Sequence, residues 1–200
     1  MDYSLSEDHQ MVRDAAREYA ESVVAPGAAE RDRTATFPWE QFRAAAEYGF
    51  TGVLVPEEYG GAGLGNVELV LTLIEVNKAC ASTGVTLSVH NSLATGSLLE
   101  AGNHEQKSTF LRRMASGEEL GAYSLSEAVS GSDAAALICG ATEDGDDLVL
   151  NGTKLWVTSA SHAGIFIVFA RTSKEDKPSR GVTCVLVEKD TPGFRVSKKE

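Results

Sequence analysis

The sequence predicts an α+β protein with two parts. An all-helical N-terminal domain is expected over residues 1–120, and an antiparallel β domain, barrel-like or a sandwich, over residues 121–200. Three observations predict this division. Apolar residues recur at helical spacing before residue 120, the period falls to two after it, and turn-forming residues separate short apolar runs in the second part. The 200 residues, 42% hydrophobic and 24% charged, are ordinary for a soluble globular protein and can bury a core.

Five helices are expected in the first part. Ser6 can cap a helix that reaches Pro26, and Pro38 begins a second helix that reaches about Tyr48. Residues 66–80 carry two apolar stripes, one of Val67, Val70, Leu71 and Ile74 and one of Leu69, Leu73, Val76 and Cys80. A helix that is apolar on most sides is expected to be buried. Residues 82–101 and 105–116 complete the set.

Four strands, a short extended stretch and several turns are expected in the second part. The segment GAYSL (121–125) reads as a short extended stretch, and GIFIVFAR (164–171) and GVTCVLVE (181–188) as strands. In DLVL-NG-TKLWVT (147–158), Asn151-Gly152 between two alternating runs predicts a tight type I′ hairpin. EDGDD and SKEDKPSRG are expected to be turns.

Charge and cysteine usage exclude several classes of protein. A net charge of −11 argues against nucleic-acid and anionic-membrane partners. The three cysteines and four histidines show no metal-ligand spacing, so no metal site is expected, and three separated thiols favour a reduced compartment. The N-terminus has no signal-peptide pattern and no apolar run reaches membrane-spanning length, so a cytoplasmic protein is expected.

The serine-hydrolase motif G-x-S-x-G is absent, and YGGAGLG (59–65) lacks phosphate-loop spacing and reads as a flexible connection.

Two stretches could carry a ligand site. In YSLSEAVSGSDAAA (123–136) the side chains after Glu127 are short, so the backbone N–H groups of Ser130 to Asp133 are approachable by an anion. Taken alone, the stretch is better explained as a plain interdomain connection with an Asx or Ser turn. In the predicted hairpin, period two places Lys154, Trp156 and Thr158 on one face, which suits a planar heteroaromatic ligand. A core-filling Trp156 with Thr158 chosen for strand propensity is the alternative.

Five ordered segments resemble the acyl-CoA dehydrogenase family of flavoproteins, its short-chain, butyryl-CoA-type members above all. They span most of the chain: VPEEYGGAGLG (55–65), SVHNSL (88–93), EAGNHEQK (100–107), YSLSEAVSGSDAA (123–135) and LNGTKLWVTSA (150–160). The resemblance implies a helical domain followed by a β domain, and FAD as cofactor. It implies α,β-dehydrogenation of an acyl-CoA thioester to a trans-2-enoyl-CoA, as in fatty acid beta-oxidation. It also implies electron transfer to an electron-transferring flavoprotein and a homotetramer in the bacterial cytoplasm or, as a mature protein, the mitochondrial matrix.

The resemblance also implies roles for individual residues. Ser126 would bond the pyrimidine side of the flavin, Gly131 and Ser132 would lie by the pyrophosphate, and Ser132 would also reach the acyl-CoA. Trp156 would flank the isoalloxazine and Thr158 would bond near its N5 edge. The implied cofactor-binding set is Tyr123, Leu125, Ser126, Gly131, Ser132, Trp156, Val157 and Thr158.

The chain departs from the family in several respects, of which two bear on the site. Glu127-Ala128-Val129 stands where the family usually has glutamate-proline-glycine. The family continues into a C-terminal helical bundle that supplies the catalytic glutamate, so the base is expected beyond residue 200 and the chain is expected to be an inactive N-terminal portion that binds FAD weakly. The alternatives are an acyl-CoA oxidase or flavin monooxygenase relative, a non-catalytic acyl-CoA- or flavin-binding module, and a purely structural protein.

Overall fold

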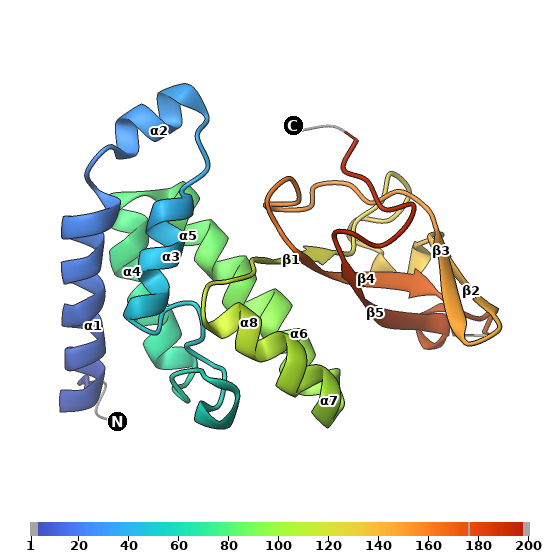
Figure 1. The fold of residues 1–200 in the computed structure, drawn as a ribbon, viewed down its shortest axis with the longest axis horizontal. Coiled ribbons are helices and arrows are strands. Elements are labelled where there is room, and N and C mark those ends of the chain that lie inside the picture. The colour runs from blue at the N-terminus through green and yellow to red at the C-terminus, as the bar shows by residue number, and fades with distance from the viewer. Residues whose placement is uncertain (1–3, 176, 198–200) are drawn as a thin grey trace. The chain divides into compact units, whose positions relative to one another are not determined.

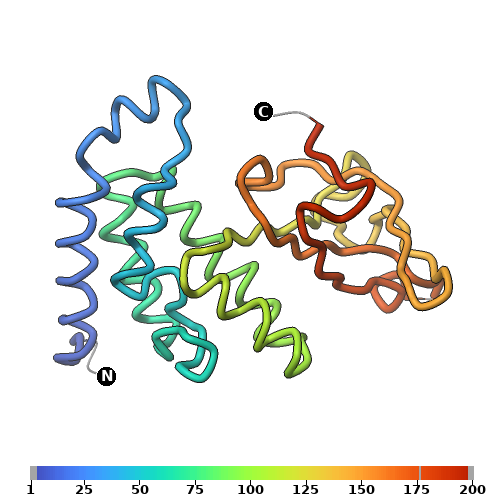
Figure 2. The backbone as a smooth tube through the Cα atoms, in the orientation of Figure 1, coloured from blue at the N-terminus to red at the C-terminus, as the bar shows by residue number. Residues whose placement is uncertain are grey.

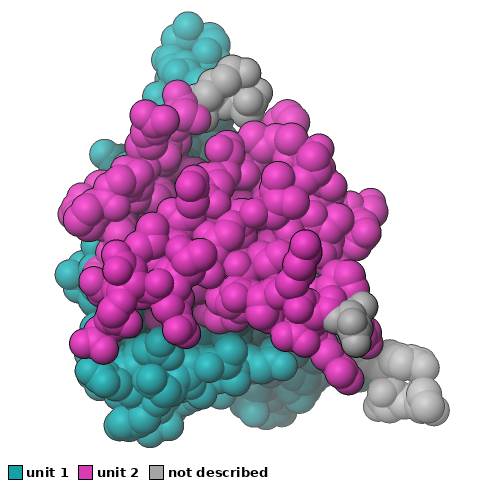
Figure 3. Space-filling view, turned by 90° about the vertical axis from the view of Figure 1, so that its right-hand side faces the viewer, with its two compact units in different colours: residues 1–120 teal, residues 121–200 magenta. Residues whose placement is uncertain are grey.

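The computed structural model describes residues 4–175 and 177–197, which belong to two separate units. Unit 1 comprises residues 1–120 and unit 2 residues 121–200 (Figure 3). Unit 1 is helical and unit 2 is built on a sheet (Figure 1). The predicted order of a helical part followed by a β part is therefore confirmed.

Unit 1 contains eight helices in its described part (Figure 1). They are α1 (Glu7–Tyr19), α2 (Ala28–Thr34), α3 (Trp39–Glu47), α4 (Asn66–Ala79), α5 (Ala81–Ser88), α6 (Gly96–Ala101), α7 (His104–Gln106) and α8 (Arg112–Ala115). π-Helical turns extend α1, join α5 to α6 and join α7 to α8: Ala20–Val24, Val89–Thr95 and Lys107–Leu111. All five expected helical stretches are present, and α2 is an addition. No helix in the described part is long and apolar enough to cross a membrane.

The start of α1 follows the predicted capping. The Ser6 hydroxyl accepts the His9 amide at 3.2 Å, and His9 Nδ1 accepts the Ser6 amide at 3.3 Å. Glu7 and Asp8 lie in the first turn, where the helix dipole favours carboxylates. The helical segment ends before Pro26, as the sequence predicts.

Buried polar side chains hold the core of unit 1 together. The Tyr19 hydroxyl donates to the Gln41 carbonyl at 2.8 Å. Asn91 accepts the Val53 amide at 3.0 Å and donates to the Phe50 carbonyl at 2.9 Å. These bonds satisfy groups that would otherwise be costly to bury, and they fix α5 and its π-helical extension against the 50–53 turn.

His90 is fully buried in the same core. Its Nε2 lies 3.2 Å from the Met114 carbonyl oxygen, and its ring meets the Phe42 ring edge-on at 5.1 Å. Burial lowers the pKa of His90 from 6.5 to about 4, against the opposing effect of its hydrogen bonds to backbone. His90 is therefore neutral at physiological pH.

Helix α4 is less buried than its composition suggests. Val67, Val70 and Ile74 are exposed, whereas Leu69 and Val76 are buried. The expectation of a helix buried on most sides was thus wrong for the stripe of Val67, Val70 and Ile74. Apolar periodicity identifies a face but does not say whether another element of the described chain covers it.

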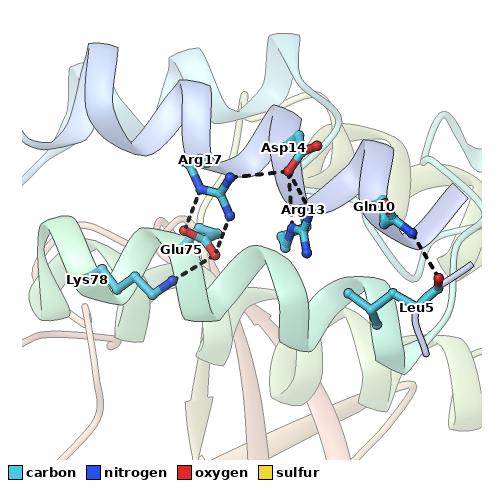
Figure 4. Close-up of polar contacts among 7 residues, drawn as sticks. All are labelled: Leu5, Gln10, Arg13, Asp14, Arg17, Glu75 and Lys78. Atoms are coloured by element: carbon cyan, nitrogen blue, oxygen red, sulfur yellow. Dashed lines mark hydrogen bonds and ion pairs between the residues drawn. The ribbon is translucent and has the colours of Figure 1, made fainter. Parts of the chain in front are cut away.

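A buried carboxylate joins α4 to α1. The side chain of Glu75 is 6% exposed; it accepts Lys78 Nζ at 2.8 Å and lies 3.4 Å from Arg17 Nε, which reaches across from α1 (Figure 4). Asp14 holds Arg17 from the other side at 3.3 Å. Hydrogen bonds from Lys78 and Arg17 outweigh the effect of burial and lower the pKa of Glu75.

Unit 2 is a mixed sheet of five described strands (Figure 1). They are β1 (Gly121–Ser124), β2 (Gly140–Asp144), β3 (Asp147–Asn151), β4 (Ile165–Arg171) and β5 (Val182–Glu188). The order is β1-β4-β2-β3, with β5 paired to β4. Central strand β4 is almost continuously buried, as its apolar run predicts.

The expected antiparallel sheet needs one correction. β5 pairs antiparallel with β4, and β3 with β2, but β1 and β2 both pair parallel with β4. β1 and β4 are separated by the whole stretch from residue 125 to 164. A connection of that length can return the chain in parallel, which a tight hairpin cannot do.

The predicted hairpin at Asn151-Gly152 was wrong. The hairpin is β2–β3, in which Asp144 pairs with Asp147 around a two-residue turn whose Gly145 has φ +64°. After β3 the chain runs irregularly to β4, as the tube in Figure 2 shows. Gly152 serves another purpose: a Cβ there would lie 2.6 Å from Cys139 Cβ and Sγ, so glycine permits close packing.

Candidate functional site

The first component of the site is a closed bend after β1. The Glu127 amide donates to the Ser130 carbonyl at 2.9 Å, and the Ser130 amide donates back at 3.2 Å, so Ala128 and Val129 form the tip. The buried Ser130 hydroxyl donates to the Asp133 carbonyl at 3.0 Å. We call residues 126–133 the serine-glycine bend. Its shape is fixed by local hydrogen bonds and not by a core of its own.

The far side of this bend is open. Gly131, Ser132 and Asp133 are exposed, and a Cβ added at Gly131 would meet nothing within 4 Å. Short side chains next to an anchored serine leave backbone groups accessible to a ligand. The structure therefore fits the anion-receiving interpretation of the stretch.

The second component is the irregular segment 152–158, which we call the tryptophan segment. Trp156 has φ +57° and is 75% exposed. The prediction that Lys154, Trp156 and Thr158 share one face of a strand was wrong, because no strand forms there. A bulky residue in the left-handed region is uncommon and strained, and such strain concentrates at functional positions. The exposure of the indole also contradicts the alternative of a core-filling Trp156.

The bend and the tryptophan segment lie against each other. The Leu155 amide donates to the Ser126 carbonyl at 2.8 Å, and Lys154 Nζ donates to the Leu125 carbonyl at 3.1 Å. The same Nζ lies 2.6 Å from Glu127 Oε1. The convergence expected of the two stretches is therefore present within unit 2.

Glu127 is the centre of this arrangement. Its carboxylate accepts the Ile138 amide at 2.7 Å, the Cys139 amide at 3.0 Å and the Lys154 ammonium. The side chains of Glu127 and Lys154 are 3% and 10% exposed. Burial raises the pKa of Glu127, but these three donors outweigh it and the net shift is downward. One ionised carboxylate thus ties the bend, the start of β2 and the tryptophan segment together.

Sequence reasoning missed this ion pair, although a signal existed. Lys154 is the only lysine or arginine between Arg113 and Arg171. Glu127 lies in a stretch of small, mostly neutral residues. Two isolated opposite charges in segments expected to converge are candidates for a buried pair.

The remaining predicted residues lie around this centre. Tyr123 is half-buried in β1 with its ring 5.1 Å from that of Phe169. Leu125, Ser126, Val157 and Thr158 are also half-buried, and Gly131, Ser132 and Trp156 are exposed. The predicted residues therefore belong to β1, the bend and the tryptophan segment, except Leu125, which connects β1 to the bend.

The chemistry available in this arrangement is binding and orientation. The indole offers a flat apolar surface, and the hydroxyls and backbone of the bend offer hydrogen bonds. Glu127 is unsuited to proton transfer because three donors occupy its ionised carboxylate. Among the described residues, no group of three or more histidine, cysteine or acidic side chains could hold a metal ion.

Comparison with known proteins gives consistent results over the whole chain. Residues 6–118 match the family model of the acyl-CoA dehydrogenase N-terminal domain, and residues 122–200 match that of the middle domain. The mitochondrial short-chain specific acyl-CoA dehydrogenase of Mus musculus is 42% identical over 196 residues, covering 98% of this chain and 47% of the relative. The chain spans about half the length of the curated relatives it matches.

Solved structures share the fold of the chain. A chain in the structure of the electron transferring flavoprotein of Acidaminococcus fermentans matches with a TM-score of 0.96 and 38% identity, covering 100% of this chain and 52% of that one. An acyl-CoA dehydrogenase of Bacillus anthracis complexed with FAD matches with a TM-score of 0.89 and 31% identity, covering 98% and 33%. The family resemblance seen in the sequence is thereby confirmed.

Proposed function

Since the chain belongs to the acyl-CoA dehydrogenase family, we propose that it supplies FAD-binding residues for the α,β-dehydrogenation of an acyl-CoA thioester to a trans-2-enoyl-CoA. The observation that carries the proposal is the junction of the serine-glycine bend with the tryptophan segment through Glu127 and Lys154. The bend alone has an ordinary structural explanation as a connection from β1 to β2. Joined, the two stretches present an exposed ring beside an open, hydroxyl-rich backbone.

The residues fit a flavin dinucleotide. Trp156 would lie against the flat ring system and shield it from water, and the hydroxyls of Ser126 and Thr158 would hold its polar edge. Gly131 and Ser132 would receive the pyrophosphate, since the bend is open there. Tyr123, Leu125 and Val157 would complete the contacts, and Ser132 would also reach the acyl-CoA. FAD, when bound, supplies the acceptor for the hydride that leaves the β-carbon.

The general base lies outside the bend and the tryptophan segment in this proposal. Removing the α-proton requires a carboxylate that is free to accept it. Glu127 does not meet that condition, because its pKa is lowered and both oxygens already accept hydrogen bonds. The role of Glu127 and Lys154 is to position the binding residues.

The relatives support proposals for the acyl chain and the electron acceptor. The short-chain specific relative supports a short-chain thioester such as butyryl-CoA. The match to a chain in an electron transferring flavoprotein structure supports such a flavoprotein as electron acceptor. A cytoplasmic homotetramer is proposed on the family resemblance alone.

The proposal is tested on the protein expressed from its complete reading frame. We expect a yellow protein whose flavin absorbance is bleached anaerobically by butyryl-CoA. Trp156→Ala is expected to lower the flavin bound per mole of protein, whereas Leu148→Ala, which removes an exposed apolar side chain from β3, is not. Peroxide release with oxygen consumption in air would favour the oxidase alternative. A protein that retains no flavin after FAD is added would overturn the proposal.

A further inference from the structure

Arg171, the last residue of β4, binds the chain that follows the serine-glycine bend. Its Nη2 donates to the Ala135 carbonyl at 2.6 Å, and its Nε donates to the Leu137 carbonyl at 3.0 Å. Its Nη1 donates to the Pro178 carbonyl at 3.1 Å, and its own amide donates to the Cys139 carbonyl at 2.7 Å. Arginine suits this position because its planar guanidinium presents several N–H donors in a fixed geometry.

The guanidinium of Arg171 serves the backbone and not another side chain. In the described part of the chain, all three of its side-chain hydrogen bonds end on carbonyl oxygens and none on a carboxylate. Leu137 is buried, so its carbonyl needs a partner within the protein. Gly181 leaves room for the guanidinium, since a Cβ there would lie 3.3 Å from Nη1. Arg171 is therefore held in place, and it holds the chain beyond the bend in turn.

This contact reaches the bend through one peptide group. The Ala135 carbonyl belongs to the 3₁₀ turn Ala134–Ala136, which begins directly after the bend. In a trans peptide the C=O and the N–H point in opposite directions, so fixing the Ala135 carbonyl also fixes the Ala136 amide. That amide donates to the Asp133 carbonyl at 3.1 Å. Arg171 therefore helps to orient the peptide that follows Asp133.

The open stretch 131–133 thus lies between two fixed points. At its start Ser130 is buried, and the Ser130 hydroxyl donates to the Asp133 carbonyl at 3.0 Å and to the Ala134 carbonyl at 3.3 Å. At its end the Asp133 carbonyl is held again by the turn that Arg171 anchors. Within the described chain, the amides of residues 131–133 donate to no backbone carbonyl, so their directions depend on these two points.

We propose that Arg171 is a positioning residue for the cofactor: it holds the stretch 131–133 in the conformation that receives the pyrophosphate of FAD. The inference rests on the proposed function, in which the bend receives that group. Lys154 fixes the beginning of the bend through Glu127 and the Leu125 carbonyl, and Arg171 fixes the chain beyond it. A site that is rigid before binding has higher affinity, because less conformational entropy is lost when the ligand binds.

The first test is the affinity for FAD, measured by titration of the apoprotein expressed from its complete reading frame. Arg171→Met removes the guanidinium, and Arg180→Met, which removes an exposed arginine from the same unit, is the matched control. We expect Arg171→Met to bind FAD about tenfold more weakly than the control, a difference of about 1.4 kcal/mol. Arg171→Lys should show a smaller loss, because one ammonium cannot hold the Ala135 and Leu137 carbonyls in the geometry of the guanidinium fork.

Two spectra of the bound cofactor separate positioning from a general loss of structure. Phosphorus NMR reports on the pyrophosphate, and visible absorbance reports on the isoalloxazine ring. We expect Arg171→Met to shift the phosphorus resonances and to leave the absorbance bands in place. Trp156→Ala, which removes the exposed indole, should have the opposite effect on the two spectra.

The outcomes distinguish this inference from the function on which it rests. Affinities of Arg171→Met and Arg171→Lys equal to that of Arg180→Met would overturn the positioning role. Phosphorus and absorbance spectra that change together would assign Arg171 to the general stability of unit 2 and would overturn it as well. If Arg171→Met does not fold, Arg171→Lys is used for the same two comparisons. An unaltered protein that binds no FAD would instead refute the proposed function and this inference together.

Discussion

Replacing Lys154 by methionine tests the buried ion pair at the centre of unit 2. Methionine keeps much of the apolar stem but removes the ammonium, which contacts Glu127 Oε1 at 2.6 Å and the Leu125 carbonyl at 3.1 Å. The Glu127 carboxylate, 3% exposed, would keep its two amide donors and lose its counter-charge. Removing one partner of a buried pair costs about 3–5 kcal/mol of unfolding free energy. Because the two amides still solvate the carboxylate, the expected loss is at the lower end, about 3 kcal/mol.

The assay is equilibrium unfolding in urea followed by tryptophan fluorescence. In a Trp39→Phe background, Trp156 is the remaining tryptophan and reports on unit 2. Lys189→Met removes an exposed lysine and should cost less than about 0.5 kcal/mol. If Lys154→Met were no more destabilising than Lys189→Met, the assignment of Glu127 and Lys154 as the centre of the site would be wrong.

A double-mutant cycle isolates the coupling between the two charges. Glu127→Gln, Lys154→Met and the double variant should give a double-variant loss clearly smaller than the sum of the single losses. Acid adds an independent readout. Because the pKa of Glu127 is lowered on folding, its contribution is present above the unfolded-state pKa and is lost as the pH falls through the folded one. That loss should be absent in Glu127→Gln, and an unchanged acid profile would contradict the pairing.

Three further predictions concern single positions. Because the pKa of His90 falls from 6.5 to about 4 on burial, its contribution to stability is complete above the unfolded value and declines as the pH falls toward the folded one. The expected loss of unfolding free energy approaches about 3 kcal/mol. It is measured as the difference between the pH–stability curves of the unaltered chain and His90→Gln. An NMR titration midpoint of His90 near its ordinary value would contradict the prediction. Gly152→Ala should cost about 1–3 kcal/mol in urea unfolding through contact with Cys139, whereas Gly140→Ala, with nothing within 4 Å, should cost less; equal losses would exclude a packing role. Ala35 ends α2 with φ +51°, so Ala35→Gly should raise the melting temperature through a gain of about 0.5–1 kcal/mol, and a lowered value would argue against that backbone.

The sequence predicted those elements whose signal is local. The Ser6 cap, the helical periods and the apolar runs at 164–171 and 181–188 each depend on neighbouring residues, and the corresponding elements are present. Two stretches expected to converge do converge, at the contact of Leu155 with Ser126. For the site, the family resemblance indicated which segments meet, because it assigned both stretches to one cofactor.

Features that depend on distant residues were missed. Asn151-Gly152 matches a hairpin signal, but Gly152 is required by the packing of Cys139, thirteen residues earlier. The parallel pairing of β1 with β4 is set by a long connection and has no local signature. The buried Glu127–Lys154 pair joins residues 27 positions apart, so neither segment alone reveals it.

The placement of Lys154 has a consequence for how ionic strength affects ligand binding. Lys154 is the only lysine or arginine among the described residues 114–170. Its ammonium is buried in the ion pair with Glu127. A phosphorylated molecule resting on this stretch would be held by amide and hydroxyl dipoles, not by mobile cations. Dissolved salt screens exposed charges far more than short-range hydrogen bonds. The affinity of this stretch for such a molecule should therefore decrease little at high salt concentration.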